Sequence, residues 1–250
     1  MKLNAFKTDL KDILPIRELY LQETNFQIRY NACHERGWTD SYLLTLDDIP
    51  VGYGSVHGQQ IADRDTVFEF YLMPAFRKYA SLVFSELLTA SSVTFIECQS
   101  NDLLLSARLY EFAGNINSEV MLFADHTVTD HKVPGVVFRR RREEDQLFEH
   151  KMEPEGEYIL EMNGEIVATG GFLKHYNKPF ADLYMEVRED QRRKGLGSFL
   201  LQEVKKECYR HGRVPAARCD IKNRASKATL IRAGLKIAGY MLLGRVKKSA

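Results

Sequence analysis

A glycine-rich basic turn, Arg192-Arg193-Lys194-Gly195-Leu196-Gly197, constrains this chain more than any other segment. It lies between an apolar run typical of a strand, residues 181–187, and an amphipathic run typical of a helix that begins at Ser198. Glycines let the backbone approach an anion closely, and the free N–H groups and the dipole of a helix start attract negative charge. The turn therefore predicts a phosphate-binding site on an α/β fold.

The same turn also has a purely structural explanation, as a tight strand-to-helix connection whose basic side chains are solvated. The sequence contains no GxxxxGK[ST], and no third glycine completes GxGxxG, so neither standard phosphate loop is present. The choice between the two explanations depends on the surrounding sequence.

Composition excludes several broad classes of protein. The 250 residues are 44% hydrophobic and 28% charged, enough for one large domain or two smaller ones, and the formal net charge is +1. This balance gives no overall attraction to nucleic acid or to a membrane surface. No window approaches the ~18 apolar residues of a membrane span, and no signal-peptide pattern opens the sequence. We expect a cytoplasmic protein without nucleic-acid or membrane partners.

The metal-binding residue types form no metal pattern. Four cysteines, Cys33, Cys98, Cys208 and Cys219, lie far apart without CxxC spacing, and the seven histidines form no HxxxH or HExxH pair. We therefore expect reduced thiols and no bound metal.

The chain contains an internal repeat. Residues 42–54 align without a gap to residues 158–170, and both segments are typical of β-hairpins, with Asn163-Gly164 suited to a type I′ turn. Residues 69–73 resemble residues 182–186 further along. An amphipathic helix follows in each half, at 81–90 and at 198–211.

Each half continues with a short strand and a second helix. The strands end at Cys98 and Cys219, and we expect Asn101 and Asn223 to open helices that close on Ala113-Gly114 and Ala233-Gly234, where glycine suits a left-handed helix end. The sequence thus predicts two domains of one mixed α/β fold, residues 1–130 and 131–250.

The two copies differ at the phosphate turn. In the N-terminal copy it reads Arg77-Lys78-Tyr79-Ala80-Ser81-Leu82, and without glycines the close approach of a pyrophosphate is expected to fail. The N-terminal copy instead has a long segment, residues 8–40, with room for two helices. The C-terminal copy has only residues 139–156 in that place.

The C-terminal half resembles the GNAT superfamily of acyl-CoA-dependent N-acyltransferases. The agreement lies in spacing: Val187 is followed by Arg192 at plus five, Gly195 at plus eight and Gly197 at plus ten, and Asn223 by Ser226 at plus three and Gly234 at plus eleven. The resemblance covers residues 136–246, and the N-terminal half resembles a degenerate second copy. It implies tandem domains, each with a mixed, mostly antiparallel twisted sheet flanked by helices.

The resemblance also implies how acetyl-CoA would bind. The pantetheine arm would pair with strand backbone as an extra strand, and the turn's N–H groups would bind the pyrophosphate. The implied cofactor-binding residues are Met185, Val187, Arg192, Arg193, Lys194, Gly195, Leu196, Gly197, Ser198, Asn223 and Ser226. Alternatives remain, because Met185 and Val187 alternate as in any half-buried strand, and Asn223 is a good N-cap without a cofactor.

The catalytic groups depart from the family pattern. Leu230 stands where members often carry a tyrosine that protonates the departing thiolate, while in the N-terminal half Tyr110 lies four residues before Gly114. Tyr240 is a candidate substitute. Asp182, Glu186 and Asp220 are candidates for the base that takes a proton from the acceptor's ammonium group, and Asp182 and Asp220 are preferred. The backbone N–H of Val187 would hold the oxyanion.

We expect an N-acetyltransferase that moves an acetyl group from acetyl-CoA to a primary amine of a small molecule by direct attack. Residues 11–37 of the N-terminal half would form one wall of the acceptor site. Two alternatives stay open: a non-catalytic CoA-binding regulatory module, which Leu230 favours, and a tRNA-dependent aminoacyl transferase, which the intact basic turn and the near-neutral charge disfavour. The sequence allows a monomer or a homodimer.

Overall fold

The computed structural model describes residues 2–151 and 153–247, and they divide into two compact units. Unit 1 comprises the residues up to Phe26, Tyr30–Val120 and those from Gly239 onward; unit 2 comprises Gln27–Arg29 and Met121–Ala238. The expected domains, 1–130 and 131–250, differ from these units in three respects: residues 27–29 belong to unit 2, unit 2 resumes at Met121, and the chain returns to unit 1 at Gly239. The return to unit 1 follows from strand pairing, because residues Met241 to Arg245 pair with a strand of the N-terminal half.

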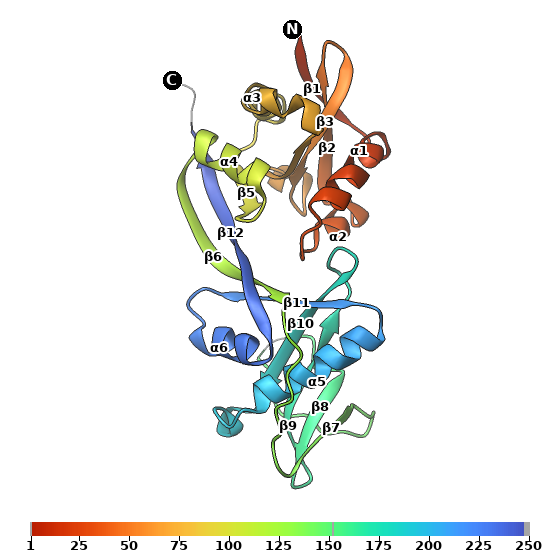
Figure 1. The fold of residues 1–250 in the computed structure, drawn as a ribbon, viewed down its shortest axis with the longest axis vertical. Coiled ribbons are helices and arrows are strands. Elements are labelled where there is room, and N and C mark those ends of the chain that lie inside the picture. The colour runs from red at the N-terminus through yellow and green to blue at the C-terminus, as the bar shows by residue number, and fades with distance from the viewer. Residues whose placement is uncertain (1, 152, 248–250) are drawn as a thin grey trace. The chain divides into compact units, whose positions relative to one another are not determined.

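In unit 1 the strand order is β1-β2-β3-β4-β5-β12-β6, and most neighbours are antiparallel. The strands are β1 (Leu3–Thr8), β2 (Thr39–Leu46), β3 (Ile49–His57), β4 (Thr66–Leu72), β5 (Phe95–Gln99) and parts of β6 (Ala113–Asp125) and β12 (Leu235–Val246). The helices are α1 (Leu10–Glu23), α2 (Tyr30–Glu35), α3 (Ala80–Ser91) and α4 (Leu103–Phe112), with 3-10 turns η1 (Ile61–Asp63) and η2 (Pro74–Tyr79). Figure 1 shows these elements.

The helices of unit 1 cover both faces of its sheet. A Cβ on Gly54 would lie 2.4 Å from a methyl carbon of Leu87 in α3, while the ring of its neighbour Tyr53 contacts that of Tyr20 in α1. Successive side chains of a strand point to opposite faces, so α3 and α1 lie on opposite sides. The two helices expected within residues 8–40 are therefore confirmed, as α1 and α2.

In unit 2 the strand order is β12-β6-β11-β10-β9-β8-β7. Its remaining strands are β7 (Val136–Arg140), β8 (Tyr158–Met162), β9 (Glu165–Leu173), β10 (Phe180–Val187) and β11 (Val214–Asp220), and its helices are α5 (Leu196–Arg210) and α6 (Arg224–Arg232), with the 3-10 turn η3 (Glu189–Gln191). Residues 141–151 and 153–157, between β7 and β8, form no helix. The short segment expected there is confirmed.

The repeat is confirmed in its hairpins and corrected at its second helices. Asn163 and Gly164 have φ angles of 53° and 80°, as a type I′ turn requires. Asn223 caps α6 by accepting from the N–H of Ser226, but α4 is capped by Asp102, one residue after the expected Asn101. Gly234 has the expected positive φ.

The expectation that Gly114 ends a helix in the left-handed conformation is wrong. The reason is that α4 leads directly into β6 at Ala113. The register of the sheet also corrects the alignment of the two copies in the next strand, β4 in unit 1 and β10 in unit 2. Phe70 lies opposite Gly54, and Met185 lies opposite Gly170, so Phe70 corresponds to Met185 and not to Leu183. A bulge between β3 and β4 breaks the regular alternation on which an ungapped comparison depends.

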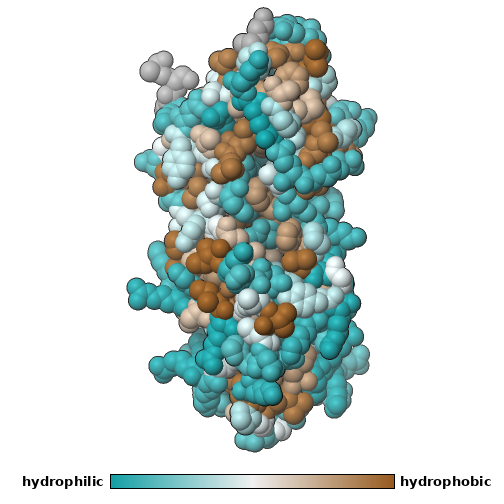
Figure 2. Space-filling model, viewed as in Figure 1, coloured by the Kyte–Doolittle hydropathy of each residue, from teal (hydrophilic) through white to brown (hydrophobic). Residues whose placement is uncertain are grey.

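Figure 2 shows hydrophilic residues over most of the visible face, with hydrophobic ones scattered among them. Within the described residues, no helix is both long enough and apolar enough to cross a bilayer.

Candidate active site in unit 2

The basic turn has the backbone shape of an anion site. Arg193 and Gly195 have φ angles of 65° and 80°, and α5 begins directly afterwards at Leu196. Among the described residues, no backbone acceptor outside the helix bonds the N–H groups from Arg193 to Ser198. Free N–H groups at a helix start, next to three cationic side chains, favour a diphosphate.

The corresponding turn of unit 1 lacks this shape. Residues Pro74–Tyr79 form the 3-10 turn η2, which runs straight into α3. The N–H groups of Phe76 and Ala80 already bond the carbonyls of Met73 and Arg77. The positive φ angles of the glycine-containing turn thus occur in unit 2 and not at this turn of unit 1. That only the C-terminal copy binds a phosphate stays a prediction.

The two glycines of the turn have different roles. A Cβ on Gly195 would meet no atom within 4 Å, so this position needs glycine for its positive φ. A Cβ on Gly197 would lie 3.1 Å from both Met185 Cε and Thr229 Cγ2, so here glycine allows α5 to pack against β10 and α6. The sequence had suggested pyrophosphate approach as the reason for Gly197.

Strands β10 and β11 separate next to the turn. Their parallel ladder consists of three pairs, ending at Asp182 with Ala216, although β10 continues to Val187 and β11 to Asp220. On its other side β10 stays paired with β9 as far as Val187. Residues 183–187 therefore present an open edge toward β11, and we call this the open edge of β10.

Alternation of the backbone identifies the groups on this open edge. The N–H of Arg188 bonds the carbonyl of Val167 in β9, so the N–H and C=O groups of Glu186 and Tyr184 also face β9. Those of Leu183, Met185 and Val187 face the open edge. The carbonyl of Val187 accepts from Arg192 Nε at 3.2 Å, which leaves Met185 with both groups available, as the resemblance implies.

The start of α6 places Asn223 and Ser226 as caps. Asn223 Oδ1 accepts from the N–H of Ser226 at 2.9 Å, which bears out the alternative explanation of Asn223 as an N-cap. The Ser226 hydroxyl bonds the thiol of Cys219 at the end of β11. A role of either residue in binding a cofactor stays a prediction.

Asp182 is the center of a polar cluster and is itself buried. Its side chain is 10% exposed, and its Oδ2 lies 3.3 Å from His175 Nε2 and 3.9 Å from Arg218 Nε. Burial, and next to it the Asp182 carboxylate, raises the pKa of Tyr176 well above its ordinary value. We call Asp182, His175, Tyr176 and Arg218 the Asp182 cluster, and it lies where the open edge begins.

The cluster lies on the face of the sheet opposite α5. Met185 approaches Gly197 of α5, so Asp182, three residues earlier, points to the other face. On that face the Thr169 hydroxyl shares a hydrogen bond with His150 Nε2 at 2.6 Å. The Glu186 carboxylate accepts a hydrogen bond from the N–H of Lys151 at 3.1 Å. The helix-free segment between β7 and β8 therefore covers the far end of the face.

Part of the N-terminal half also belongs to this unit. The carbonyl of Ile28 accepts from the N–H of Asn177 at 2.7 Å, next to Tyr176 in the chain. The charge of Arg29 acts on the Tyr176 hydroxyl. Residues 27–29 lie within the stretch 11–37 that was expected to wall the acceptor site.

The other candidate groups are placed less favourably. Asp220 is exposed and accepts from the N–H of Lys222, whereas Tyr240 belongs to unit 1, where its backbone bonds Ser100. The matching caps Asp102 and Asn223 make Leu109, not Tyr110, the counterpart of Leu230, seven residues after each cap. Leu109 and Leu230 are buried, so neither unit has a tyrosine at that position.

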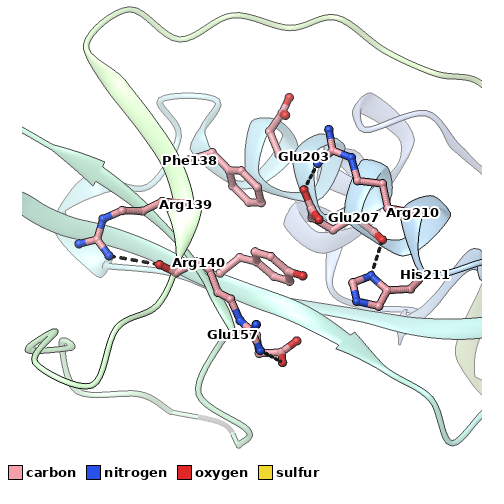
Figure 3. Close-up of a pocket in the computed structure, with 9 residues that line it drawn as sticks. Phe138, Arg139, Arg140, Glu157, Glu203, Glu207, Arg210 and His211 are labelled. Carbon is pink, nitrogen blue, oxygen red and sulfur yellow. Dashed lines mark hydrogen bonds and ion pairs between the residues drawn. The ribbon is translucent and has the colours of Figure 1, made fainter.

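A cavity of about 530 Å³ lies elsewhere in unit 2, between β7 and the second half of α5 (Figure 3). Phe138 comes from the strand, and Glu203, Glu207 and Arg210 come from the helix. None of the predicted site residues lines it. Within the described residues no group of side chains suits a metal ion.

Residues 124–234 match the model of the acetyltransferase (GNAT) family. Residues 124–234 therefore belong to that family, and the resemblance to the GNAT superfamily is confirmed for this part of the chain. These findings support an acyltransferase.

Solved structures share the fold over the whole chain. A GNAT-family acetyltransferase from Colwellia psychrerythraea has a TM-score of 0.73 at 14% identity, with 99% of this chain and 100% of that chain covered. A tandem GNAT protein from the clavulanic acid biosynthesis pathway has a TM-score of 0.62 at 11% identity, with both chains fully covered, at 100%. A GCN5-related N-acetyltransferase from Sphaerobacter thermophilus has a TM-score of 0.60 at 15% identity, with 97% and 95% covered. A comparison with curated protein sequences finds no match.

Proposed function

We propose that unit 2 transfers an acetyl group from acetyl-CoA to a primary amine of a small molecule, by direct attack of the amine on the thioester. The observation that carries the proposal is the combination of two features at one end of β10. A turn with free N–H groups opens α5, and the ladder between β10 and β11 ends at Asp182. Together they fit a donor with an anionic diphosphate and an extended amide-bearing arm.

The residues present fit such a donor in charge and in length. Arg192, Arg193 and Lys194 supply positive charge at the turn. From Val187 to Leu183 the open edge spans four residues, about 13 Å at the usual strand rise. An arm lying along this edge would bring its acyl end toward Asp182.

In this proposal Asp182 takes the proton that the acceptor's ammonium group must lose. The thioester carbonyl then has to lie near the same amine. Val187 is five residues from Asp182, about 16 Å along the strand, so its N–H is too distant to hold the oxyanion beside that base. The N–H groups of Leu183 and Met185 face the same edge and lie closer, and we assign the oxyanion to them.

The test is a calorimetric titration with acetyl-CoA of the full chain, the variant Arg193→Glu and the matched variant Lys78→Glu. Arg193 and Lys78 are both exposed and occupy corresponding turns. We expect one equivalent bound, at least tenfold weaker binding for Arg193→Glu, and no change for Lys78→Glu. Two equivalents, equal losses in both variants, or no binding at all would contradict the proposal. Gly197→Glu is a poorer probe, because the side chain would meet Met185 and Thr229.

A CoA-binding module without transferase activity is the second candidate. The observation that favours it is the buried Leu230, which leaves α6 without the tyrosine that often protonates the thiolate in the family. The two functions separate in one assay: a transferase releases free CoA thiol in the presence of an accepted amine, whereas a binding module retains acetyl-CoA unchanged.

A further inference from the structure

Two guanidinium groups act on the Asp182 cluster. Arg218 lies beside the Asp182 carboxylate, and the charge of Arg29 acts on Tyr176, which contacts the same carboxylate. Guanidinium groups stay protonated throughout the physiological range. Positive charge therefore persists beside the Asp182 carboxylate at Arg218, and Arg29 acts on Tyr176.

The positive charge of Arg218 bears on which acceptor can enter. A simple amine is an ammonium cation at neutral pH, so it gains from Asp182 but is repelled by Arg218. An amine that also carries an acidic group a few bonds away presents both signs of charge. Such a molecule satisfies Asp182 and an arginine at the same time.

Arg218 is placed to receive the acidic group. Its side chain is 37% exposed, and its Nε contact with Asp182, at 3.9 Å, is longer than a hydrogen bond. It stands two residues beyond Ala216, the partner of Asp182, and therefore on the same face of the sheet. A guanidinium group that is exposed and not held by its neighbour can bind a carboxylate through two parallel hydrogen bonds.

We propose that the acceptor is an amino acid or a close analogue, whose ammonium group binds Asp182 and whose carboxylate binds Arg218. This rests on the proposed acyl transfer in unit 2. The nitrogen gives one proton to Asp182, which passes it to solvent, and forms the C–N bond to the thioester carbonyl carbon. The C–S bond breaks, and the departing thiolate takes up the second proton from the nitrogen. The products are an N-acyl amino acid and free CoA.

The test compares the twenty L-amino acids with their carboxamides, which keep the amine and lose the negative charge. Release of CoA thiol from acetyl-CoA is followed with the full chain. We expect accepted amino acids to exceed their carboxamides at least about tenfold in kcat/KM. In Arg218→Ala the ratio falls toward one, mainly through a higher KM for the amino acid, and Arg218→Lys restores part of it. Arg210→Ala, on the exposed side of α5, is the matched control and keeps the ratio.

Binding provides a second readout that needs no turnover. The ligand is the N-acetyl derivative of an accepted amino acid, titrated in the presence of CoA into the wild type and into Arg218→Ala. We expect this ligand to bind more weakly to Arg218→Ala than to the wild type. Equal rates for amino acids and carboxamides, a ratio unchanged in Arg218→Ala, or no amino acid accepted would overturn the inference. Those results leave acetyl-CoA binding and its loss in Arg193→Glu intact, whereas the absence of acetyl-CoA binding overturns the proposed function itself.

Discussion

Arg192 donates from its Nε to the carbonyl oxygen of Val187, five residues earlier, at 3.2 Å. Unit 1 repeats this bond between Arg77 Nε and the Leu72 carbonyl, at 3.1 Å. In both units the arginine ties the start of the turn to the last residue of a strand. In the part of the chain that the structure describes, the strand of unit 2 ends beside N–H groups without a backbone acceptor outside the helix, whereas the turn of unit 1 bonds its own carbonyls. The same bond therefore supports the proposed binding turn in unit 2 and a structural turn in unit 1.

Arg192→Ala should therefore weaken acetyl-CoA binding while leaving the fold intact. The Arg192 side chain is 44% exposed, so the lost bond costs unit 2 less than about 1 kcal/mol in unfolding free energy. We expect acetyl-CoA affinity to fall about three- to tenfold, because a cation is lost and the turn loosens. Arg77→Ala is the matched control in a calorimetric titration, and an equal loss there would refute a specific role for Arg192.

The identity of the base is tested by Asp182→Asn and Asp220→Asn. We expect Asp182→Asn to lower kcat about 100-fold or more, with acetyl-CoA affinity unchanged, because proton removal fails while the donor still binds. Asp220, exposed and bonded to the backbone of Lys222, should matter far less. Steady-state kinetics of both variants test this assignment. A larger fall in kcat for Asp220→Asn than for Asp182→Asn would assign the base to Asp220 in β11.

The buried Glu69 in unit 1 predicts acid sensitivity. Glu69 is fully buried and accepts from Arg17 at 2.9 and 2.7 Å, from Tyr53 at 3.1 Å, and pairs with His34 at 3.0 Å. Burial by itself raises the pKa of Glu69, but the charges of Arg17 and His34 outweigh it and hold this pKa far below its ordinary value. The native carboxyl thus resists protonation.

The sign of the pH effect follows from linkage. In the unfolded chain Glu69 has its ordinary pKa of 4.5, so as the pH falls below that value the unfolded state takes up a proton that the native state does not. The stability from Glu69 is complete at neutral pH and declines on acidification. Denaturant unfolding at pH 7, 5, 4 and 3 should show this decline in the wild type. Glu69→Gln should lose about 3–5 kcal/mol at pH 7 and show a flatter profile; an unchanged slope would contradict the assignment.

Asp102 should behave in the opposite way. Its side chain caps α4 through the N–H of Leu105, yet burial raises its pKa from 3.8 to about 6. Ionization of the buried carboxyl therefore costs stability as the pH rises from about 4 through 6. Asn caps helices as well as Asp, and unit 2 carries Asn223 at this position. We expect Asp102→Asn to be neutral at pH 4 and to stabilize unit 1 by about 1–3 kcal/mol at pH 8, measured by denaturant unfolding. A loss at pH 8 would show that the charge itself is needed.

Local patterns in the sequence predicted the local structure well. The dipeptide Asn163-Gly164 and the spacing from Val187 to Gly197 predict a turn and a loop whose geometry depends on a few adjacent residues. The cap at α4 was misplaced by one residue because Asn101 and Asp102 are both good N-caps, and propensity does not choose between them. The positive φ expected at Gly114 failed because β6 continues directly from the helix.

The Asp182 cluster could be predicted only in part. Asp182 was a candidate because of its place on a strand beside the turn. His175 and Tyr176 come from the β9–β10 connection, and Arg218 from β11, and no spacing in the sequence relates them to Asp182. Their proximity depends on strand register, in particular on Asp182 lying opposite Ala216. The allocation of residues 27–29 to unit 2 is equally nonlocal.

The pairing of β5 with β12 has a consequence for how such a chain is made. The two strands lie roughly 140 residues apart, and a ribosome adds about 5–20 residues per second. For on the order of ten seconds, nascent β5 lacks a neighbour on that side and exposes an open row of N–H and C=O groups, the kind of edge that recruits other chains. The hazard of misassembly in this protein is therefore greatest during translation, while the ribosome is still completing unit 2.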